Sequence, residues 1–580
     1  MAINGVILKN FLNNPVGDNV RHILVIPDYQ RPYAWEKDDQ ALKLFTDICD
    51  YANDTAGGTA EPYFLGTIVG YYNKSTNELE IIDGQQRITT LFLLLRAIYT
   101  RLADEDCNGN KNKEDVLHYY MTAIAQALWE SKYGKPNFNS VSLVTKIESG
   151  AAILNAILQT GVASEKNKDN YSQNYLMFQN KLNEYFGRQI LDGAYNFFEA
   201  LIERTIVLPI IADSEDTALR IFTTLNDRGL PLSDADIFKA QIYRRLPDDN
   251  AKDDFISTWQ NLSNDANLGG KEIQDLFTYY MFYLRACKED TDTTTIAMRR
   301  YYAGKDNDFL LLRNPSLLKD IGIIASLLKT MNRNPDANDP LAGNATVLQL
   351  LDILTYYPNE FGKYPAIIFY LAHHSKEGFG EAFQAFLKNL IALAAVKFAL
   401  EPSVNSIKGE VLKLNTEIIR SMHPTFNFGI KPANAAEALK TPNAKLVQLL
   451  LCVLAYNNPS QKELLKRSWQ IEHILPQSQK WQEVFLKGKS KTEIREWVET
   501  FGNKLPLEWK INATASDDCF RIKKEQYRKS KIALVNQMAQ NDALNKWDFD
   551  KIKERNETVA KELVETFTRW NADYDKLGNK

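Results

Sequence analysis

The sequence predicts an α+β protein that is predominantly helical, and three observations lead to this fold class. Over residues 1–105, short strand-like apolar runs mix with helical segments. Over most of residues 115–460, apolar residues recur every three or four positions, as they do along helices that bury one face. Within residues 461–580, two short strand candidates precede a helix. Together these patterns predict an α/β beginning, a helical middle and a small ββα end.

A chain of 580 residues is long enough for roughly three or four domains. We expect three: an α/β domain with a helical extension at 1–255, a helical domain at 256–440 and a ββα domain at 441–580. Hydrophobic residues make up 44% of the chain and charged residues 24%, which argues against a mainly disordered protein. The five cysteines are scattered and include no C-x-x-C pair, so they predict neither a disulfide framework nor a zinc ribbon and fit a reducing cytosol.

Charge is distributed unevenly along the chain. The 69 basic and 73 acidic residues give a net charge of −4. Residues 461–580 contain 24 basic and 19 acidic residues, a net charge of +5, and leave 45 against 54, or −9, for residues 1–460. The positive excess concentrates in RIKKEQYRKSK at 521–531. We therefore expect the C-terminal part to face a polyanion.

The sequence gives no sign of a membrane protein. Its N-terminus lacks a basic segment followed by a sustained apolar stretch, so we expect no signal peptide. The richest apolar runs, at 91–95 and 390–400, are too short or interrupted by charge to cross a bilayer, which takes about 20 apolar residues. We expect a soluble protein of the bacterial cytoplasm with no membrane partner.

Three apolar runs within residues 1–105 predict strands, at 22–27, 63–72 and 79–82. The third run leads through a D-G turn into a predicted helix, in the sequence EIIDGQQRITTLFLLL. One interpretation is that Asp83 caps the helix. The other is an anion site, because the free N–H groups of a helix N-terminus attract phosphate and Arg87 with the threonine hydroxyls would complete a cradle. Asp83 would then hold a divalent cation or a polarised water.

Two further segments suggest the same chemistry. IPDYQRPYAW at 26–35 gathers Arg31 and three aromatic side chains, suited to stacking on a base or gripping phosphate. The alternative is an aromatic loop held on the core by its two prolines. ALRIFTTLNDRGLPLSDADIFKAQIYRRL at 218–246 contains an N-D-R-G turn at Asn226 and a helix-capping signature at Ser233, although an ordinary helical hairpin has the same pattern.

Over about residues 10–250, the chain resembles the ParB-like DGQQR domain of GmrSD-type modification-dependent restriction systems. Four segments carry this resemblance by their order and spacing: YQRPYAW, FLGTIV, IIDGQQRITTL and IFTTLNDRGLPLSDADIFKA. In that family the N-terminal domain binds and hydrolyses a nucleoside triphosphate at the DGQQR segment. The resemblance therefore implies bound ATP, GTP or CTP and a catalytic role for Asp83. The implied nucleotide-binding residues are Arg31, Asp83, Gly84, Gln85, Gln86, Arg87, Thr89 and Asn226.

A second constellation surrounds His473, one of six histidines. A lone histidine is more often a packed or surface residue than a catalyst. Here WQIEHILP predicts a strand that ends at His473, GNKLPLEW at 502–509 predicts a second strand, and a helix is expected from about Asp517. Strand, strand and helix in this order is the layout of ββα-metal nucleases, whose chemistry needs a base to activate water and a hard divalent cation on the scissile phosphate.

The residues of this segment suggest a division of roles. His473 would be the base, because its pKa lies close to working pH. Asn503 would hold the loop that bears the histidine or orient the imidazole, and we count it with the catalytic residues. Glu472 and Asn512 would bind the metal, although Glu472 needs a local twist because neighbours on a strand face opposite sides. Oxygen ligands favour Mg²⁺ or Mn²⁺.

This segment resembles the HNH-type C-terminal domain of the same restriction family, over about residues 445–570. One departure is Pro506, which would confine its strand to an edge or a bulge and leaves the partner of Asn503 open. The final metal ligand also stays open. The residues that match the family signature are Glu472, His473, Ile474, Pro476, Gly502, Asn503, Asn512, Phe520, Lys523 and Tyr527.

The two resemblances imply an NTP-regulated, metal-dependent DNA endonuclease of phage defence, in the manner of type IV restriction of modified DNA. Its expected partners are double-stranded and modified phage DNA, a nucleoside triphosphate and a second copy in a homodimer; which modification is recognised stays open. The alternative is a nucleotide-switched, ParB-like DNA-binding regulatory protein without nuclease activity. The candidate DNA-phosphate contacts, for which a solvated helix face is the alternative, are Arg521, Lys523, Lys524, Arg528 and Lys529.

Overall fold

A computed structural model describes most of the chain, and its elements confirm an α+β, predominantly helical protein. The chain packs as two compact units, Met1–Ile256 and Ser257–Lys580. The expected middle and C-terminal domains fall together in the second unit. The residues that the structure leaves undescribed are 1–4, 18–20, 55–60, 106, 108, 134, 187–194, 215–216, 219–220, 222–232, 295, 307, 338, 479–487, 489 and 579–580.

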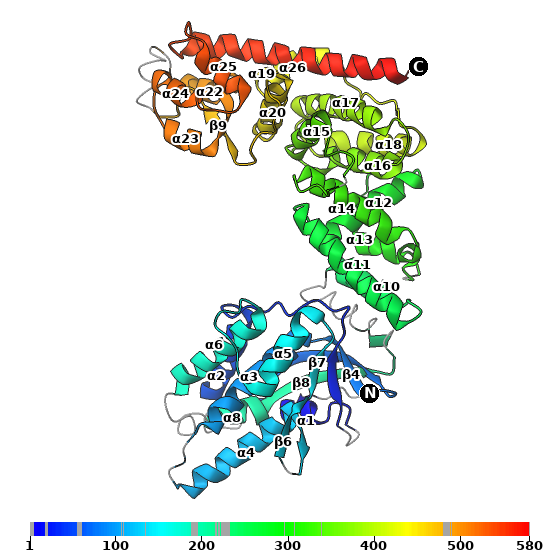
Figure 1. Ribbon diagram of the computed structural model, residues 1–580, viewed down its shortest axis with the longest axis vertical. Helices are drawn as coiled ribbons and strands as arrows, with labels where there is room; N and C mark the ends of the chain where they lie inside the picture. The colour runs from blue at the N-terminus through cyan, green and yellow to red at the C-terminus, as the bar shows by residue number, and fades with distance from the viewer. Residues whose placement is uncertain are drawn as a thin grey trace. The chain divides into compact units, whose positions relative to one another are not determined.

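A six-stranded mixed sheet forms the centre of the first unit (Figure 1). β2 runs parallel to β4 and β7, and β3 runs parallel to β8 and antiparallel to β4. Because β2 and β4 are parallel, their C-terminal ends meet at one edge of the sheet, which brings the loop after β2 beside the turn after β4. In spatial order the strands are β1 (Val6–Ile7), β8 (Thr205–Ala212), β3 (Tyr63–Asn73), β4 (Glu78–Asp83), β2 (Ile23–Ile26) and β7 (Leu143–Thr145).

The three strands expected from the apolar runs are present as β2, β3 and β4, but β8 was not expected. Its first residues belong to NFFEALIERTIV at 196–207, which has helical spacing and lies within the stretch 115–460 that the apolar pattern predicts to be helical. The helical turns of this segment end at Arg204, and Thr205 begins the strand that pairs with both β1 and β3. The segment forms a strand because its β-branched run TIV pairs with two neighbouring strands, and such pairing cannot be read from local periodicity.

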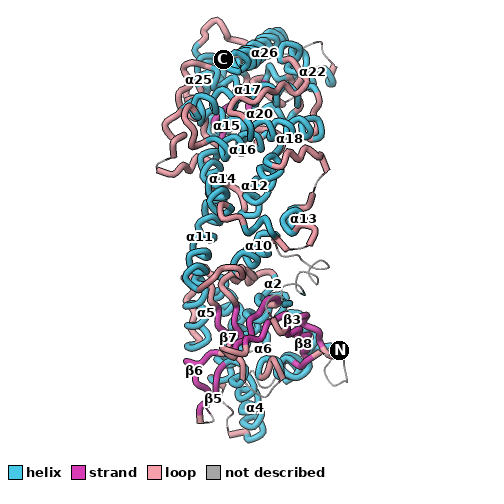
Figure 2. The backbone as a smooth tube through the Cα atoms, turned by 90° about the vertical axis from the view of Figure 1, so that its right-hand side faces the viewer, coloured by secondary structure: helices cyan, strands magenta, loops and turns pink. Residues whose placement is uncertain are grey.

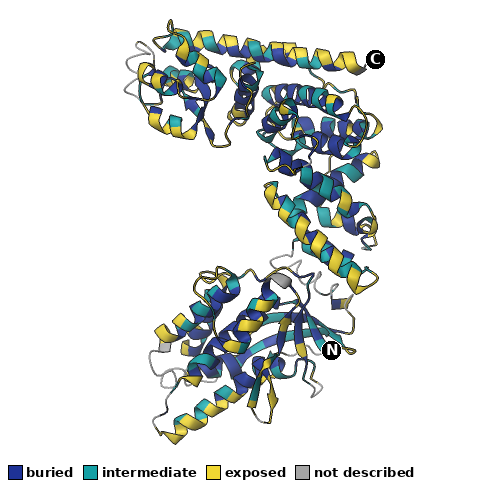
Figure 3. Ribbon diagram, in the orientation of Figure 1, coloured by how far each residue is buried: buried dark blue, intermediate teal, exposed yellow. Residues whose placement is uncertain are grey.

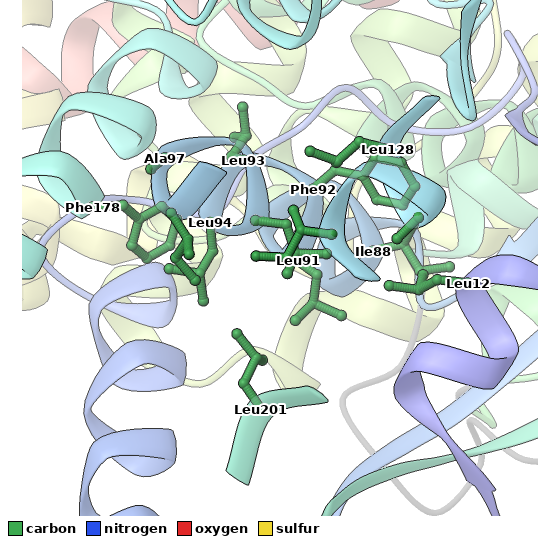
Figure 4. Close-up of a cluster of buried hydrophobic side chains, with 14 of the residues drawn as sticks. Leu12, Ile88, Leu91, Phe92, Leu93, Leu94, Ala97, Leu128, Phe178 and Leu201 are labelled. Atoms are coloured by element: carbon green, nitrogen blue, oxygen red, sulfur yellow. The ribbon is translucent and has the colours of Figure 1, made fainter. Parts of the chain in front are cut away.

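Helix α3 (Gln85–Ala103) is the central core helix of the first unit, and every residue from Ile88 to Tyr99 is buried. β4 passes into it through Gly84, whose φ of 91° is a conformation that favours glycine. Figure 4 shows its leucines packed among side chains of neighbouring helices, such as Phe178 and Leu128. This packing fixes the start of α3, and with it the D-G-Q-Q-R turn, relative to the sheet.

The remaining elements of the first unit cover the sheet or extend from it. A two-stranded hairpin, β5 with β6, is separate from the main sheet (Figure 2). Helix α11 (Asp249–Leu268) carries the chain into the second unit. The other elements are α1 (Leu8–Asn13), α2 (Gln40–Asp54), α4 (Lys111–Leu128), β5 (Trp129–Lys132), β6 (Lys135–Val141), α5 (Glu148–Thr160), α6 (Asn170–Phe186), α8 (Tyr195–Phe198), a π-helical turn (Glu199–Arg204) and α10 (Asp234–Tyr243).

The second unit is helical apart from one small sheet. Its last helix, α26, packs along α17, α19 and α20 and exposes its outer face (Figures 1 and 3). The α-helices before the small sheet are α12 (Ile273–Cys287), α13 (Met298–Ala303), α14 (Leu317–Met331), α15 (Ala345–Thr355), α16 (Tyr364–His373), α17 (Phe379–Leu400), α18 (Asn405–Arg420), α19 (Ala436–Lys440) and α20 (Val447–Asn457). The elements after them are β9 (Trp469–His473), α22 (Lys491–Glu499), β10 (Lys504–Glu508), α23 (Trp509–Ala515), α24 (Phe520–Tyr527), α25 (Ala533–Gln540) and α26 (Phe549–Gly578).

One helix among the described residues, α17, is long and apolar enough by length and composition to cross a membrane. The bent pair Pro432–Lys440 and Ala444–Asn457 passes the same test only if it is counted as one span. Of the most apolar window of α17, 67% is buried inside the fold, where it packs against α15, α16, α18 and α26. That is the position of a core helix.

Candidate functional site

The C-terminal candidate site is built on a two-stranded antiparallel sheet. β9 pairs with β10 so that His473 lies opposite Lys504. The amide of Ile474 donates to the carbonyl of Asn503 at 2.9 Å, and hydrogen-bonded pairs alternate along an antiparallel ladder. Pro506, three residues beyond Asn503, therefore falls at a position whose nitrogen faces away from β9. This is how the strand accommodates the proline that departs from the family pattern.

The expected helix after the second strand is divided in two. α23 begins at Trp509, directly after β10, and ends at Ala515. Ser516 adopts a positive φ of 45°, and α24 begins at Phe520. The sequence prediction of one helix from about Asp517 therefore missed α23, because a seven-residue helix gives little periodicity to detect. α23 matters because it carries Asn512.

His473 and Asn512 line the same polar cavity, which has a volume of about 260 Å³. The Nδ2 of Asn512 donates to Oε1 of Gln470 at 3.1 Å. This bond fixes the amide and leaves Oδ1, the atom that can bind a cation, without a hydrogen bond from the described residues. Asp517 lines the cavity as well and was not among the expected site residues.

The imidazole of His473 contacts a carboxylate that sequence reasoning missed. Nε2 of His473 lies 3.4 Å from Oε2 of Glu499, at the end of α22. Lys504 Nζ lies 3.0 Å from the same oxygen, and Gln477 Nε2 donates to Oε1 of Glu499 at 2.6 Å. The only signal in the sequence was the place of Glu499, four residues before Asn503, in the segment that returns the chain to β10.

These contacts set the protonation of the pair. Burial lowers the pKa of His473 below its ordinary value, and attraction to Glu499 opposes this only in part. For Glu499, burial raises the pKa, but the hydrogen bonds from Lys504 and Gln477 prevail and hold it at about 2. At neutral pH the carboxylate is therefore ionised and the imidazole is neutral, which is the form that can accept a proton.

Asn503 is completely buried and holds the chain that follows His473. Its Oδ1 accepts from the amide of Leu475 at 2.8 Å and from the indole of Trp547 at 3.0 Å. Its Nδ2 donates to the carbonyls of Leu475 and Val498 at 3.0 and 2.9 Å. These bonds occupy the whole amide, so of the two roles expected for Asn503 the structure has the loop-holding one. The expected grouping of Asn503 with the catalytic residues is corrected to a positioning role.

Gly502 explains why glycine precedes this asparagine. A Cβ atom at Gly502 would lie 2.6 Å from the carbonyl oxygen of Ile552 and 2.7 Å from the backbone nitrogen of Asn556, both on α26. The amide of Gly502 also donates to Oδ1 of Asn556 at 2.8 Å. The backbone before β10 therefore touches the C-terminal helix directly, and only glycine permits that approach.

Glu472 is buried and belongs to a network with helix α24. Its Oε1 accepts from Nζ of Lys523 at 2.7 Å and from the hydroxyl of Tyr527 at 2.5 Å. Lys523 Nζ also donates to the carbonyl of His473 at 2.8 Å. Three residues of the family signature thus join α24 to β9. Oε2 of Glu472 receives no hydrogen bond from the described residues, and Glu472 lines the cavity, so this second oxygen stays available to a cation.

The expected DNA contacts divide into two groups. Lys523 and Lys524 are only 1% and 7% exposed, and Lys524 Nζ donates to the carbonyls of Asn541 and Leu544 at 2.6 and 2.9 Å. Their assignment as phosphate contacts is therefore wrong: both ammonium groups are used to fasten α24 inside the fold. Arg521, Arg528 and Lys529 are exposed and remain candidates.

The N-terminal candidate site is the turn between β4 and α3. Asp83 is half-buried, and burial raises the pKa of its carboxyl, while attraction to Arg87 and Arg31 and a hydrogen bond from the amide of Gly84 oppose that rise. Arg31 is exposed on the loop after β2. Among the described residues, no side chain caps the N-terminus of α3. A carboxylate, two guanidinium groups and an uncapped helix N-terminus therefore meet at one edge of the sheet.

Gln85 and Gln86 are buried and hold the loop after β2 in place. Gln86 Oε1 accepts from the amide of Ala34 at 2.8 Å, and its Nε2 donates to the carbonyl of Pro32 at 3.2 Å. Gln85 Nε2 donates to Oε1 of Gln30 at 3.2 Å. The direct nucleotide contact expected of Gln86 is therefore corrected to a supporting role, because both polar atoms of its side chain bond to the loop. Gln85 supports the loop through Nε2, and its contact with nucleotide stays a prediction.

Arg87 and Thr89 also depart from the expected cradle. Arg87 Nη1 donates to the carbonyl of Thr67 at 3.0 Å and packs on Gly66, where a Cβ atom would lie 2.2 Å from Nη1. Thr89 is 1% exposed inside the core, which corrects its expected contact with nucleotide. Asn226 lies outside the residues that the structure describes. The expected nucleotide-binding residues that remain candidates at this edge of the sheet are Arg31, Asp83, Gly84, Gln85 and Arg87, of which Gln85 already uses Nε2 and Arg87 already uses Nη1 within the protein.

The third motif segment reaches this edge through α10. Ser233 caps that helix, accepting from the amide of Asp236 at 3.2 Å, as its sequence signature predicts. Lys239 Nζ donates to the carbonyl of Asp28 at 3.2 Å, and the hydroxyl of Tyr243 donates to Oδ2 of Asp28 at 3.1 Å. The segments around residues 28, 83 and 239, far apart in the sequence, therefore lie together.

Comparison with protein families gives two matches. The model described as "GmrSD restriction endonuclease, N-terminal domain" matches residues 8–243, and the model described as "GmrSD restriction endonucleases, C-terminal domain" matches residues 431–562. A search of curated proteins finds no match. The two family matches include both candidate sites and leave out most of the helices between them.

Proposed function

The chain belongs to the GmrSD restriction endonuclease family, and from this premise we propose that its C-terminal site cleaves DNA with a divalent cation under the control of a nucleoside triphosphate bound at its N-terminal site. As a restriction endonuclease of phage defence it acts on DNA. One observation carries the proposal. His473, with a pKa lowered by burial, lines a polar cavity together with an amide oxygen and a carboxylate oxygen that the described residues leave free of hydrogen bonds.

In the proposed reaction His473 removes a proton from water. Because Glu499 is ionised and lies beside Nε2, the proton of the neutral imidazole resides on Nε2, and Nδ1 carries the free electron pair. The activated water attacks phosphorus, a new P–O bond forms, and the bond to the 3′ oxygen breaks. The leaving oxygen takes a proton from solvent. Asn503 takes no part in these steps; it holds the chain after His473 in place through the backbone of Leu475.

The residues present fit a divalent cation of the Mg²⁺ or Mn²⁺ type. Glu472 Oε2 and Asn512 Oδ1 are hard oxygen donors on the cavity, and water and phosphate oxygens would complete the shell. When bound, the cation would neutralise charge on the scissile phosphate. No group of three or more His, Cys, Asp and Glu side chains suited to a metal occurs in the described part of the chain.

The proposed nucleotide site is the edge that carries Asp83. The uncapped N-terminus of α3 and the guanidinium groups of Arg31 and Arg87 favour a triphosphate, and Asp83 suits a cation bound with it. ATP, GTP and CTP all fit this chemistry. Modified phage DNA as the substrate and a homodimer belong to the same proposal, and so does cleavage of one or of both strands.

Plasmid cleavage tests the C-terminal assignment. The wild-type protein, with Mg²⁺ or Mn²⁺ and with or without NTP, is expected to cut at least one of four DNAs: unmodified, hydroxymethylated, glucosylated or phosphorothioated. His473→Ala should lower the rate by at least roughly 100-fold, because a general base contributes that much or more. His423→Ala, at an exposed histidine outside the site, is the control and should keep full activity.

Two outcomes would contradict the assignment. Wild-type protein that cuts none of the four DNAs under any metal or nucleotide, while still binding DNA, would favour the regulatory DNA-binding alternative. Cleavage at the wild-type rate by folded His473→Ala would place the active site elsewhere.

A further inference from the structure

A second cavity in the Ser257–Lys580 unit shares no lining residue with the cavity of His473. It has a volume of about 260 Å³ and is lined by helices α15, α17, α20 and α26; α26 contacts both α17 and α20, and α15 contacts both as well (Figure 1). Two basic side chains face it, Lys388 from α17 and Arg569 from α26, together with the ring of Trp570. Neither helix segment belongs to the nuclease sheet or its cavity.

Lys388 differs from the other buried lysines of this unit. Lys329 pairs with Asp265 at 2.9 Å, and Lys523 pairs with Glu472 at 2.7 Å. Lys388 is half-buried, yet among the described residues it makes no ion pair and no hydrogen bond through its ammonium group. Desolvating an ammonium group without a partner is unfavourable, so a fold that keeps one there requires a reason.

The charges around Lys388 point to an anion. Burial lowers its pKa, repulsion from Arg569 lowers it further, and Asp573 opposes this only in part. The carboxylate of Asp573 is exposed and its ion pair is with Lys576, at 3.7 Å. Arg569 donates to Oδ1 of Asn457 at 3.2 Å and forms no ion pair within the described part of the chain. Two cations therefore line this cavity together with a single carboxylate among the described residues, that of Asp573, so the charge of its lining is positive.

We propose that this cavity is a binding site for a small phosphate-bearing anion, held between Lys388 and Arg569 with Trp570 as its apolar wall. Guanidinium and ammonium groups are the usual phosphate partners in proteins. The volume admits a phosphate with an attached sugar or a small ring, but not a duplex. A free phosphate or mononucleotide is therefore favoured over the backbone of DNA. The site is independent of the nuclease and NTP assignments, since it shares no residue with either.

Hydrogen exchange of the full-length protein locates binding without interference from the N-terminal site. Inorganic phosphate, AMP and a 20-base-pair duplex are the three probes. Phosphate and AMP should slow exchange in the peptides of α17 and α26 that contain Lys388 and Arg569. Lys388→Met, which keeps the apolar stem, and Arg569→Met should each weaken this protection about 10-fold or more in ligand concentration, because each removes a charged hydrogen bond.

A melting experiment separates binding from a structural role. Without ligand, Lys388→Met should keep or raise the Tm, by up to roughly 3 °C, because it removes an unpaired buried charge. Lys413→Met, at an exposed lysine paired with Glu410, is the matched control and should change neither Tm nor protection. The proposal is overturned if neither phosphate nor AMP protects α17 and α26, if only the duplex does so, or if both methionine variants retain wild-type protection.

Discussion

At the scale of single residues, the chemistry of His473 depends on side chains that are distant in sequence. Burial keeps the imidazole neutral, and Glu499, itself held ionised by Lys504 and Gln477, orients it from α22. Asn503 acts through the backbone of Leu475 and not through the imidazole. Asn503, which the sequence groups with the catalytic residues, is thus a positioning residue. Glu499, which the sequence did not single out, contacts the base His473.

Glu499→Gln tests this orientation. The amide still accepts from Nε2, so KM should change little, whereas kcat should fall about 10-fold because the imidazolium that forms loses its counter-charge. Attraction to Glu499 raises the pKa of His473, so its removal lowers that pKa further. Since activity needs the neutral base, cleavage is lost as pH falls through this pKa, and the acid limb should move to lower pH.

A pH profile of kcat/KM between about pH 5 and 8 measures the shift. Glu496→Gln, on the exposed face of the same helix, is the matched control. An acid limb that stays in place, or moves to higher pH, would show that Glu499 does not interact with the base.

At the scale of elements, the nuclease sheet depends on one close approach between backbones. Gly502 touches α26 at Ile552 and Asn556, and the buried guanidinium of Arg555 donates to the carbonyls of Gly502 and Lys504 at 2.6 and 2.9 Å. Burial lowers the pKa of Arg555 to about 10. The last helix thereby holds the segment between α22 and β10, on which Asn503 and the histidine loop depend.

Gly502→Ala should destabilise the second unit by about 1–3 kcal/mol, because the added methyl group meets backbone atoms that cannot move aside. The shift of the urea unfolding midpoint, followed by tryptophan fluorescence, measures it. Gly380→Ala is the control, since a Cβ atom there meets nothing within 4 Å and the position is helical. It should be neutral or stabilise by up to about 1 kcal/mol. Equal midpoints for the two variants would rule out the close approach.

Elements were predictable where local pattern and tertiary environment agree. The alternating run at 79–82, the D-G turn and the apolar helix after it predicted β4, Gly84 and α3. The helical spacing of NFFEALIERTIV misplaced β8, because strand pairing with β1 and β3 overrides it. The seven residues of α23 were missed for lack of length.

At the scale of the whole molecule, the proposed nucleotide site and the proposed nuclease site lie in different units, so control of one by the other must be a coupling of free energies. If NTP raises the affinity for DNA by some factor, then DNA must raise the affinity for NTP by the same factor. Binding measured in both directions with cleavage-deficient His473→Ala should give equal factors. Asp83→Asn should reduce both to about one, because it removes the charge that suits the cation of the nucleotide.

Two results would contradict this coupling between the nucleotide site and the nuclease site. An effect of NTP on cleavage that persists at full size in Asp83→Asn would move the regulatory site away from the β4–α3 turn. A cleavage rate that no NTP alters would remove the coupling and leave the nuclease assignment intact.

The sequence by itself determined the fold class, the strand–turn–helix around Asp83 and the ββ pair that ends at His473, because periodicity, turn residues and short motifs are local properties. It also indicated the positive C-terminal part of the chain. Only the tertiary structure decided which charged side chains are accessible to a ligand and which are buried or paired within the protein. Lys523 and Lys524 look like DNA contacts in a basic run but are buried on the inner face of α24, while Lys388, in an apolar helix, faces Arg569 across a cavity. Burial and pairing of charge arise between segments far apart in the chain, so no local pattern contains them.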